Sequence, residues 1–108
     1  METTIDNVEN IKRFNPTKCF LGTGGVNLEK GFISNYEEVD GEVKREYINS
    51  SREVYLLAEN QKFYEDALFN FAHLKDIDFI ITDKKLGKVQ LEKLDEYGIE
   101  LLLVEKSE

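Results

Sequence analysis

A glycine-rich segment near the start of the chain has the composition of an anion-binding loop. It consists of Gly22, Thr23, Gly24 and Gly25. Glycine tolerates positive φ and lets backbone N–H groups approach an anion, and the threonine adds a hydroxyl donor. The segment matches neither a Walker A loop nor the dinucleotide-binding fingerprint, so a plain tight turn is the alternative. The sequence therefore predicts either a phosphate-sized anion site or a turn.

Two later segments carry polar residues that suit the same ligand. Glu59 and Lys62 lie in the first, and Thr82 and Asp83 lie in the second. A lysine can donate a charge-assisted hydrogen bond to a phosphate, and carboxylates can accept hydrogen bonds from sugar hydroxyls. The alternative is that these residues are solvated loop charges, since charged side chains are usually exposed.

Lys44 is a second candidate cation for this ligand. Asp40 lies four residues earlier, so the alternative is a surface ion pair within a helix. The chain has a single histidine, His73, and a single cysteine, Cys19, with no partner at metal-ligand spacing. We therefore expect no metal, no cofactor and no catalytic residue. Packing or surface exposure accounts for His73, and Cys19 is expected to be a buried structural thiol.

Four short apolar runs are expected to form the strands that position these residues. They are mostly continuous, which is typical of parallel strands covered on both faces. In open parallel sheets, ligands bind beyond the carboxyl ends of the strands, and the three polar segments follow the first three runs. We therefore expect these segments to converge on one edge of the sheet. The runs span residues 18–21, 54–58, 79–82 and 99–104.

Two segments with helical periodicity lie between these runs and predict two βαβ units. Gly98 is placed to end the second helix in a left-handed conformation. The first helix spans 37–51, with apolar Val39, Val43, Tyr47 and Ile48, and the second spans 87–97, with Val89, Leu91, Leu94 and Tyr97.

Two other segments are less regular. Within 62–77, an edge strand with Phe69 and Phe71 facing inward is favoured over a short helix. Apolar spacing predicts a helix over 5–12, which ends before Pro16 because proline disfavours helical geometry in the preceding residue.

Length and charge restrict the class of protein. With 108 residues and 41% hydrophobic residues, the chain fits one α/β domain over 1–108 with a mainly parallel sheet and flanking helices. The net charge is −8 and no basic stripe is present, so direct nucleic-acid binding is not expected. No apolar stretch approaches a membrane span and no signal peptide is recognisable, which favours a soluble, cytoplasmic protein without membrane contact.

Four ordered motifs in residues 17–105 resemble the later part of the effector-sensing domain of DeoR-type transcriptional regulators. The resemblance implies a fold like that of ribose-5-phosphate isomerase and a sensor that binds a phosphorylated sugar and thereby relieves repression. It also implies that the glycine segment, Lys62, Thr82 and Asp83 surround the effector. The motifs are CFLGTGGV at 19–26 followed by GFIS at 31–34, EVKR at 42–45, LLAENQKF at 56–63 and IDFIITD at 77–83.

The sequence also departs from that family. Glu59-Asn60-Gln61 stands where an aspartate and two small hydroxyl residues are usual, and neither a winged helix nor the family's early phosphate loop is present in these residues. Without the segment that usually covers one side of the sheet, an apolar face or an open strand edge is expected. A homo-oligomer is then expected, most simply a two-fold dimer formed through the 37–51 helix or an outer strand.

Two other functions remain open. One is a phosphosugar isomerase-like enzyme that acts through a carboxylate base, although the loop after the first run has no acidic cluster. The other is an oligomerisation domain that binds no ligand.

Overall fold

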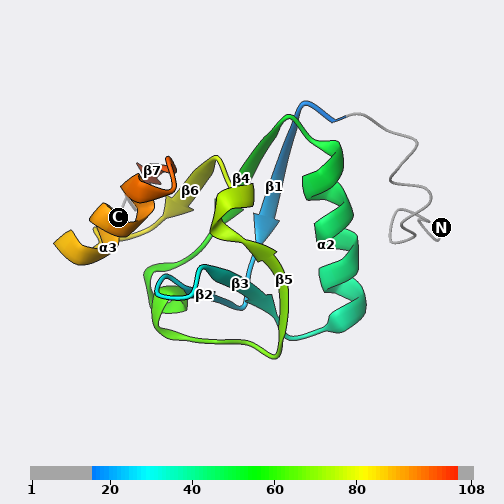
Figure 1. Ribbon diagram of the computed structural model, residues 1–108, viewed down its shortest axis with the longest axis horizontal. Coiled ribbons are helices and arrows are strands. Elements are labelled where there is room, and N and C mark those ends of the chain that lie inside the picture. Colours follow the sequence, from blue (N-terminus) through cyan, green and yellow to red (C-terminus); the bar gives the residue numbers. More distant parts are fainter. Residues whose placement is uncertain (1–15, 105–108) are drawn as a thin grey trace.

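A four-stranded parallel sheet is the centre of the computed structural model, which describes residues 16–104 (Figure 1). The strand order is β1-β4-β6-β7, and every neighbouring pair is parallel. These strands coincide with the four apolar runs, so the predicted mainly parallel α/β fold is confirmed. The strands are β1 (Lys18–Gly22), β4 (Glu53–Leu57), β6 (Phe79–Thr82) and β7 (Glu100–Leu103).

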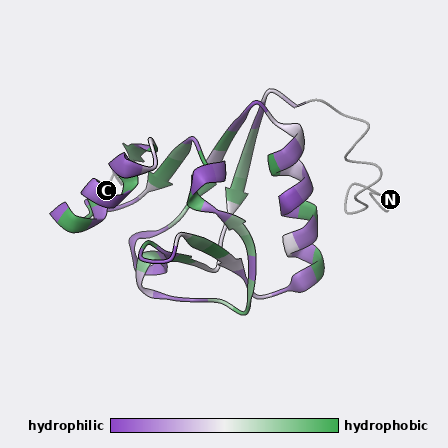
Figure 2. Ribbon diagram, in the orientation of Figure 1, coloured by the Kyte–Doolittle hydropathy of each residue, from purple (hydrophilic) through white to green (hydrophobic). Residues whose placement is uncertain are grey.

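Side chains of the parallel sheet alternate between a buried face and a more exposed face. Cys19 and Leu21 of β1 are buried, whereas Phe20 between them is exposed. The buried face joins both helices and the second sheet in one hydrophobic core, in which Ile48 and Leu94 are the helical contributions. The strands are therefore hydrophobic along their length (Figure 2), but within residues 16–104 only one face is covered. The expectation of cover on both faces is wrong for this part of the chain.

A second, antiparallel sheet was not predicted. It has the order β2-β3-β5, with β2 (Gly25–Asn27), β3 (Phe32–Asn35) and β5 (Phe69–His73). The turn between β2 and β3 is closed by hydrogen bonds to Asn27, whose backbone oxygen accepts from the Gly31 N–H at 2.7 Å. Gly31 has φ of 81°, a left-handed conformation that glycine adopts without strain.

The predicted edge strand in the 62–77 segment is confirmed, but only one of the two side chains predicted to face inward does so. β5 is an edge strand and buries Phe71, whereas Phe69 is exposed. Ala72 pairs with Ile33 and Asn70 pairs with Ser34, so Phe71 is the extra residue of a β-bulge. A bulge breaks the two-residue alternation of a strand, which is why Phe69 and Phe71 do not share a face.

The two predicted helices are present as α2 (Glu38–Ser50) and α3 (Lys88–Glu96). The predicted apolar stripe of α2 is confirmed at Ile48, which is buried, and at Tyr47, which packs against the core. Val39 is exposed, however, and Gly41, which the stripe did not include, is buried. A Cβ on Gly41 would lie 3.3 Å from the Phe71 side chain, so its absence lets α2 lie close to β5. In α3 only Leu94 is fully buried, and Gly98 has φ of 72°, as predicted for the residue that ends the helix.

Two 3₁₀ helices complete the described chain, η1 (Asn60–Tyr64) and η2 (Leu74–Asp76). His73 packs edge-on against Phe32 and Tyr97, so packing does account for it. Cys19 is buried, as expected, and burial raises the pKa of its thiol. No helix in residues 16–104 is long and apolar enough to cross a membrane. The predicted helix over 5–12 lies outside the described residues.

Candidate functional site

The segments that follow β1, β4 and β6 meet at the carboxyl edge of the parallel sheet, as the strand order requires. Gly22 is paired with Leu57, and Leu57 with Ile81, so the ends of the three strands form one row. A cavity of about 340 Å³ opens there. Six of the predicted site residues line it, together with Leu57, Ala58, Ile81 and Val104: Gly22, Thr23, Glu59, Lys62, Thr82 and Asp83.

A second cavity of about 310 Å³ adjoins the first and shares Gly22, Thr23 and Lys62 with it. It reaches α2, so Gly24 and Lys44 also line it. We call these two cavities together the edge site. Eight of the nine predicted residues line the edge site, and Gly25 lines neither cavity. The remaining lining residues of the second cavity are Asn35, Tyr36, Glu37 and Asp40.

The glycine segment forms a turn whose polar groups are largely used internally. The Gly24 N–H donates to Ser34 O at 2.9 Å, and the Gly25 N–H donates to Thr23 Oγ1 at 3.2 Å. The Thr23 hydroxyl has the backbone oxygens of Gly25 and Ser34 as acceptors, at 3.0 and 2.9 Å. None of the three glycines of this segment has positive φ, so the prediction that the segment needs glycine in order to adopt positive φ is wrong. The turn fixes the path from β1 into β2.

Lack of space for a side chain explains why positions 24 and 25 are glycine. A Cβ on Gly25 would overlap the backbone oxygen of Glu65, and a Cβ on Gly24 would lie 2.9 Å from the Tyr36 ring. Gly22 differs from both, because a Cβ there would meet nothing within 4 Å. The backbone of Gly22 therefore lies open to the edge site.

Lys44 is a tether between α2 and the glycine segment. Its Nζ lies 3.0 Å from Gly22 O, 2.9 Å from Asn35 Oδ1 and 3.3 Å from Asp40 Oδ2. The ion pair with Asp40 is therefore present, but the Lys44 side chain is only 18% exposed and is not the surface partner that a helix pair suggests. The hydrogen bond from Asn35 and the charge of Lys44 hold the pKa of Asp40 below its usual value.

Among residues 16–104, the ammonium group of Lys62 has fewer hydrogen-bond and ion-pair partners than that of Lys44. Its Nζ has one acidic neighbour in the structure, Glu65 Oε2 at 3.5 Å, and its side chain is 24% exposed between the two cavities. Lys62 lies on η1, whose first residue, Asn60, donates its backbone N–H to Asp83 Oδ1 at 2.9 Å. That bond joins the segment after β4 to the segment after β6 and fixes the position of η1.

Thr82 offers an unused hydroxyl beside the first cavity. The residue is 3% exposed, and its Oγ1 is buried without a hydrogen-bond partner among residues 16–104. An unpaired buried hydroxyl costs about 1–3 kcal/mol relative to a paired one. Asp83 and the exposed Glu59 add carboxylates near it. The edge site therefore combines two lysines, of which Lys44 is already hydrogen-bonded, with four carboxylates and one hydroxyl that has no partner among residues 16–104. The carboxylates are those of Glu37, Asp40, Glu59 and Asp83.

Sequence reasoning missed Asn35. Its side chain donates to Asp40 at 2.8 Å and accepts from Lys44, so it orders the charged pair on the wall of the second cavity. Asn35 ends β3, a strand that the apolar pattern did not reveal. An asparagine after a short apolar run and before an acidic helix start is the only signal in the sequence.

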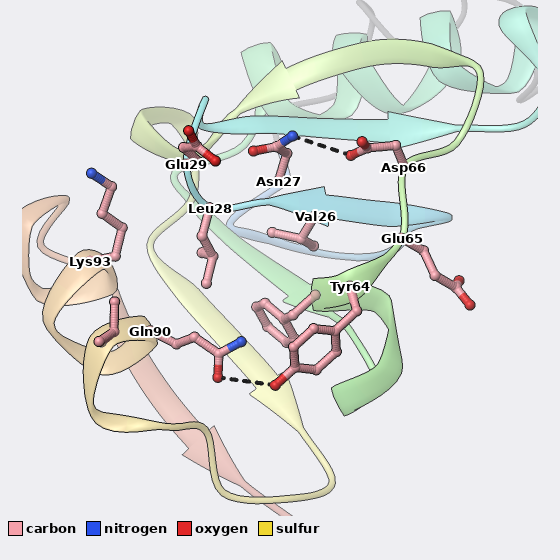
Figure 3. A pocket seen from close by; sticks show the side chains of 11 residues that line it. Val26, Asn27, Leu28, Glu29, Tyr64, Glu65, Asp66, Gln90 and Lys93 are labelled. Atoms are coloured by element: carbon pink, nitrogen blue, oxygen red, sulfur yellow. Dashed lines mark hydrogen bonds between the residues drawn. The ribbon is translucent and has the colours of Figure 1, made fainter.

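A larger cavity, of about 500 Å³, lies elsewhere, between β2, η1 and α3 (Figure 3). None of the nine predicted residues lines it. Its charged lining consists of three carboxylates, on Glu29, Glu65 and Asp66, and one ammonium group, on Lys93. Asp66 accepts a hydrogen bond from Asn27 at 3.4 Å. This lining has no unpaired buried donor for an anion, so its greater volume does not make it the better phosphate site. Within residues 16–104, no three histidine, cysteine or acidic side chains are grouped to hold a metal ion.

Known proteins of similar sequence are transcriptional regulators. The family model described as the DeoR C-terminal sensor domain matches residues 3–84. The HTH-type transcriptional repressor GlcR of Bacillus subtilis is 33% identical over 101 residues, which are 94% of this chain and 38% of that protein. The HTH-type transcriptional regulator IolR of the same organism is 26% identical over 95 residues, 88% of this chain and 38% of that protein.

A third relative is the glycerol-3-phosphate regulon repressor of Haemophilus influenzae. It is 29% identical over 72 residues, which are 67% of this chain and 28% of that protein. The matched region is therefore at most 38% of the length of these three regulators.

Proposed function

This chain belongs to the family of DeoR C-terminal sensor domains, and we propose that it binds a phosphorylated sugar at the edge site as the effector-sensing part of a transcriptional regulator. The observation that carries the proposal is the meeting of three strand-end segments around one cavity pair. In parallel sheets this edge is where ligands usually bind, because all strand ends and their loops lie there.

Each polar group of the edge site has a distinct task in this proposal. Lys62 donates to the phosphate, because its ammonium group has one acidic neighbour among residues 16–104, at 3.5 Å. Glu59 and Asp83 supply the carboxylates that accept from sugar hydroxyls. Thr82 contributes the hydroxyl that has no partner among the described residues. Lys44 and Thr23 hold the glycine segment in shape.

The name of one relative supports a small phosphorylated ligand. The Haemophilus influenzae protein is named for a glycerol-3-phosphate regulon. A phosphorylated polyol is the chemistry that one ammonium group and nearby carboxylates suit. The relatives are named regulators or repressors, which favours sensing over the isomerase alternative.

A thermal-shift panel tests the proposal. The purified chain is heated with phosphorylated sugars and, as matched controls, with the same sugars lacking the phosphate. At 100 times its dissociation constant, a ligand specific to the folded state stabilises it by about 2.7 kcal/mol. We expect stabilisation by at least one phosphosugar and none by its unphosphorylated counterpart. Equal responses to both, or no response to any, would contradict the proposal. Interconversion of aldose and ketose forms in the same samples would indicate the isomerase alternative instead.

A further inference from the structure

The edge site carries more negative than positive charge. Four carboxylates and two lysines line it, and one of the lysines, Lys44, is already paired with Asp40. A phosphate group brings about two further negative charges at neutral pH. Like charges placed close together disfavour binding, so Lys62 by itself does not balance a phosphorylated ligand at this site. A ligand that also carries a positive charge would offset the excess.

Glu59 is the carboxylate of the first cavity that is available to such a charge. Its side chain is exposed and lines the cavity of about 340 Å³. Glu59 is the N-cap residue of η1, but its side chain makes no capping hydrogen bond. Asp83, by contrast, accepts the Asn60 N–H at 2.9 Å, and Asp40 in the second cavity accepts from Asn35 at 2.8 Å. Glu59 can therefore bind a ligand group without giving up a structural bond.

Glu59 and Lys62 present opposite charges from one turn of the chain. They are the N-cap residue and the third residue of η1, and both line the same cavity. The ion-pair partner of Lys62 within residues 16–104 is Glu65 and not Glu59. The hydrogen bond from Asn60 to Asp83 holds this turn against the end of β6. One ligand can therefore place an anionic group on Lys62 and a cationic group on Glu59.

We propose that the ligand of the edge site is an amino sugar phosphate, with its phosphate on Lys62 and its ammonium group on Glu59. The buried Thr82 hydroxyl, which has no partner among residues 16–104, lies at the same cavity and bonds the sugar between these two groups. The assignment of Glu59 rests on the proposed function and refines it, because the partner of this carboxylate becomes an ammonium group instead of a hydroxyl.

Calorimetric titration of the full chain with matched pairs of sugar phosphates tests the ligand class. The members of a pair differ only in an amino or a hydroxyl group: glucosamine-6-phosphate with glucose-6-phosphate, and galactosamine-6-phosphate with galactose-6-phosphate. A chelator is present, so that no divalent cation supplies the positive charge. We expect the amino member of at least one pair to bind about fivefold more tightly, the effect of one ion pair at an exposed carboxylate. N-acetylation keeps the nitrogen but removes its charge, and is expected to abolish the advantage.

Glu59→Gln tests which carboxylate binds the ammonium group. The amide still accepts a hydrogen bond from a hydroxyl, but it has no charge. The amino sugars are therefore expected to lose their advantage in this variant, while the hydroxyl sugars bind as they do to the wild type. Because Glu59 is exposed and its side chain makes no capping bond, an unchanged melting temperature is expected. The matched control is Glu92→Gln, at an exposed position of α3 that lines neither cavity of the edge site, and it is expected to keep the preference.

The possible failures separate the ligand class from the proposed function. Equal or tighter binding of the hydroxyl member in both pairs, or an amino preference that survives Glu59→Gln, would overturn the amino sugar assignment. The proposed function would then stand, since a phosphosugar still binds. Binding of none of these sugars would also overturn the assignment, and the thermal-shift panel decides separately on other phosphosugars. If glucosamine without phosphate binds as tightly as its phosphate, the proposed function fails as well.

Discussion

The two lysines of the edge site differ in what their ammonium groups already bind. Lys44 has three oxygen acceptors within 3.3 Å, which matches the three hydrogens of an ammonium group. Lys62 has a single carboxylate neighbour at 3.5 Å. A phosphate can therefore recruit Lys62 without breaking a structural bond, whereas recruiting Lys44 would release Gly22 and Asn35. In the proposed binding mode, Lys62 is therefore the lysine that binds the ligand and Lys44 is the lysine that holds the structure.

Substitution by alanine is expected to lower ligand affinity at Lys62 and to lower the stability of the fold at Lys44. Lys62→Ala removes a charge-assisted hydrogen bond to the phosphate, which contributes about 1.5–3 kcal/mol. Phosphosugar affinity measured by calorimetry is expected to fall roughly 10- to 100-fold, with the melting temperature unchanged. Lys44→Ala leaves acceptors without a donor and is expected to lower the free energy of unfolding by about 1–3 kcal/mol. The exposed Lys84→Ala is the control for both. Equal affinity in the wild type and Lys62→Ala would remove Lys62 from the site.

Gly22→Ala is expected to affect binding and not folding. A methyl group there meets no protein atom within 4 Å, and the φ of Gly22 is not positive, so the fold accepts it. The same methyl group occupies ligand space. Overfilling a packed site costs about 1–3 kcal/mol, roughly a factor of 5 to 150 in affinity. Gly87→Ala, at an exposed position that lines neither cavity of the edge site, is the control. A Gly22→Ala protein that binds as tightly as the wild type would show that the ligand does not approach this backbone.

At the scale of elements, an ion pair joins α2 to η2. Arg45 Nη1 lies 2.7 Å from Asp76 Oδ2, and the same carboxylate accepts the His73 N–H at 3.0 Å. Burial raises the pKa of Asp76, but these donors lower it more, so the pKa lies below the ordinary 3.8. The contribution to stability is complete above that ordinary value and is lost as the pH falls through the lower pKa of the folded protein.

Asp76→Asn is therefore expected to reduce the dependence of stability on pH. The amide retains an oxygen acceptor but cannot titrate. At neutral pH the variant is expected to be less stable than the wild type in urea unfolding. As the pH falls below the ordinary value of 3.8, the wild type loses the contribution of the ionised pair, so the difference between the two proteins is expected to shrink. Asp95→Asn, at an exposed position of α3, is the control. A constant difference at all pH values would contradict this role of Asp76.

The strands of the parallel sheet could be predicted because their apolar runs are continuous and bounded by polar segments. The β2–β3 hairpin could not, because β2 has only three residues and its partner β3 is paired on the other edge with β5, more than thirty residues away. The burial of Gly41 on α2 could not be predicted for a related reason. Gly41 is buried because Phe71 lies against it, and neither glycine nor a bulged residue produces an apolar pattern.

The convergence of the site could also be predicted, since parallel strands place their carboxyl ends together. Which of the polar groups already have hydrogen-bond partners within the protein could not be predicted. Thr23 carries the expected hydroxyl, but its acceptors are the backbone of Gly25 and Ser34. Lys44 has the spacing of a surface pair with Asp40, yet its main partners come from β1 and β3. Hydrogen-bond partners distant in sequence decide whether a polar side chain is available to a ligand.

For the whole molecule, the arrangement separates three surfaces with different chemistry. The edge site has two lysines, four carboxylates and the Thr82 hydroxyl, which has no partner among residues 16–104. The exposed face of the parallel sheet carries the stacked rings of Phe20, Tyr55 and Phe79, and the large cavity beside α3 has three carboxylates and one lysine. The net charge of −8 does not attract an anion, so phosphate recognition depends on local donors. A phosphorylated ligand is therefore expected at one place only. That location is the central claim of the account.

Nuclear magnetic resonance gives the most direct measurement of that location. The phosphosugar that stabilises the chain most is titrated into isotope-labelled protein, and the backbone amide shift of each residue is followed. The account predicts saturable shift changes concentrated at Gly22, Lys62 and Asp83, with Val89 and Lys93 of the large cavity unchanged. Saturable changes centred on Val89 and Lys93, or no saturable change anywhere, would contradict it.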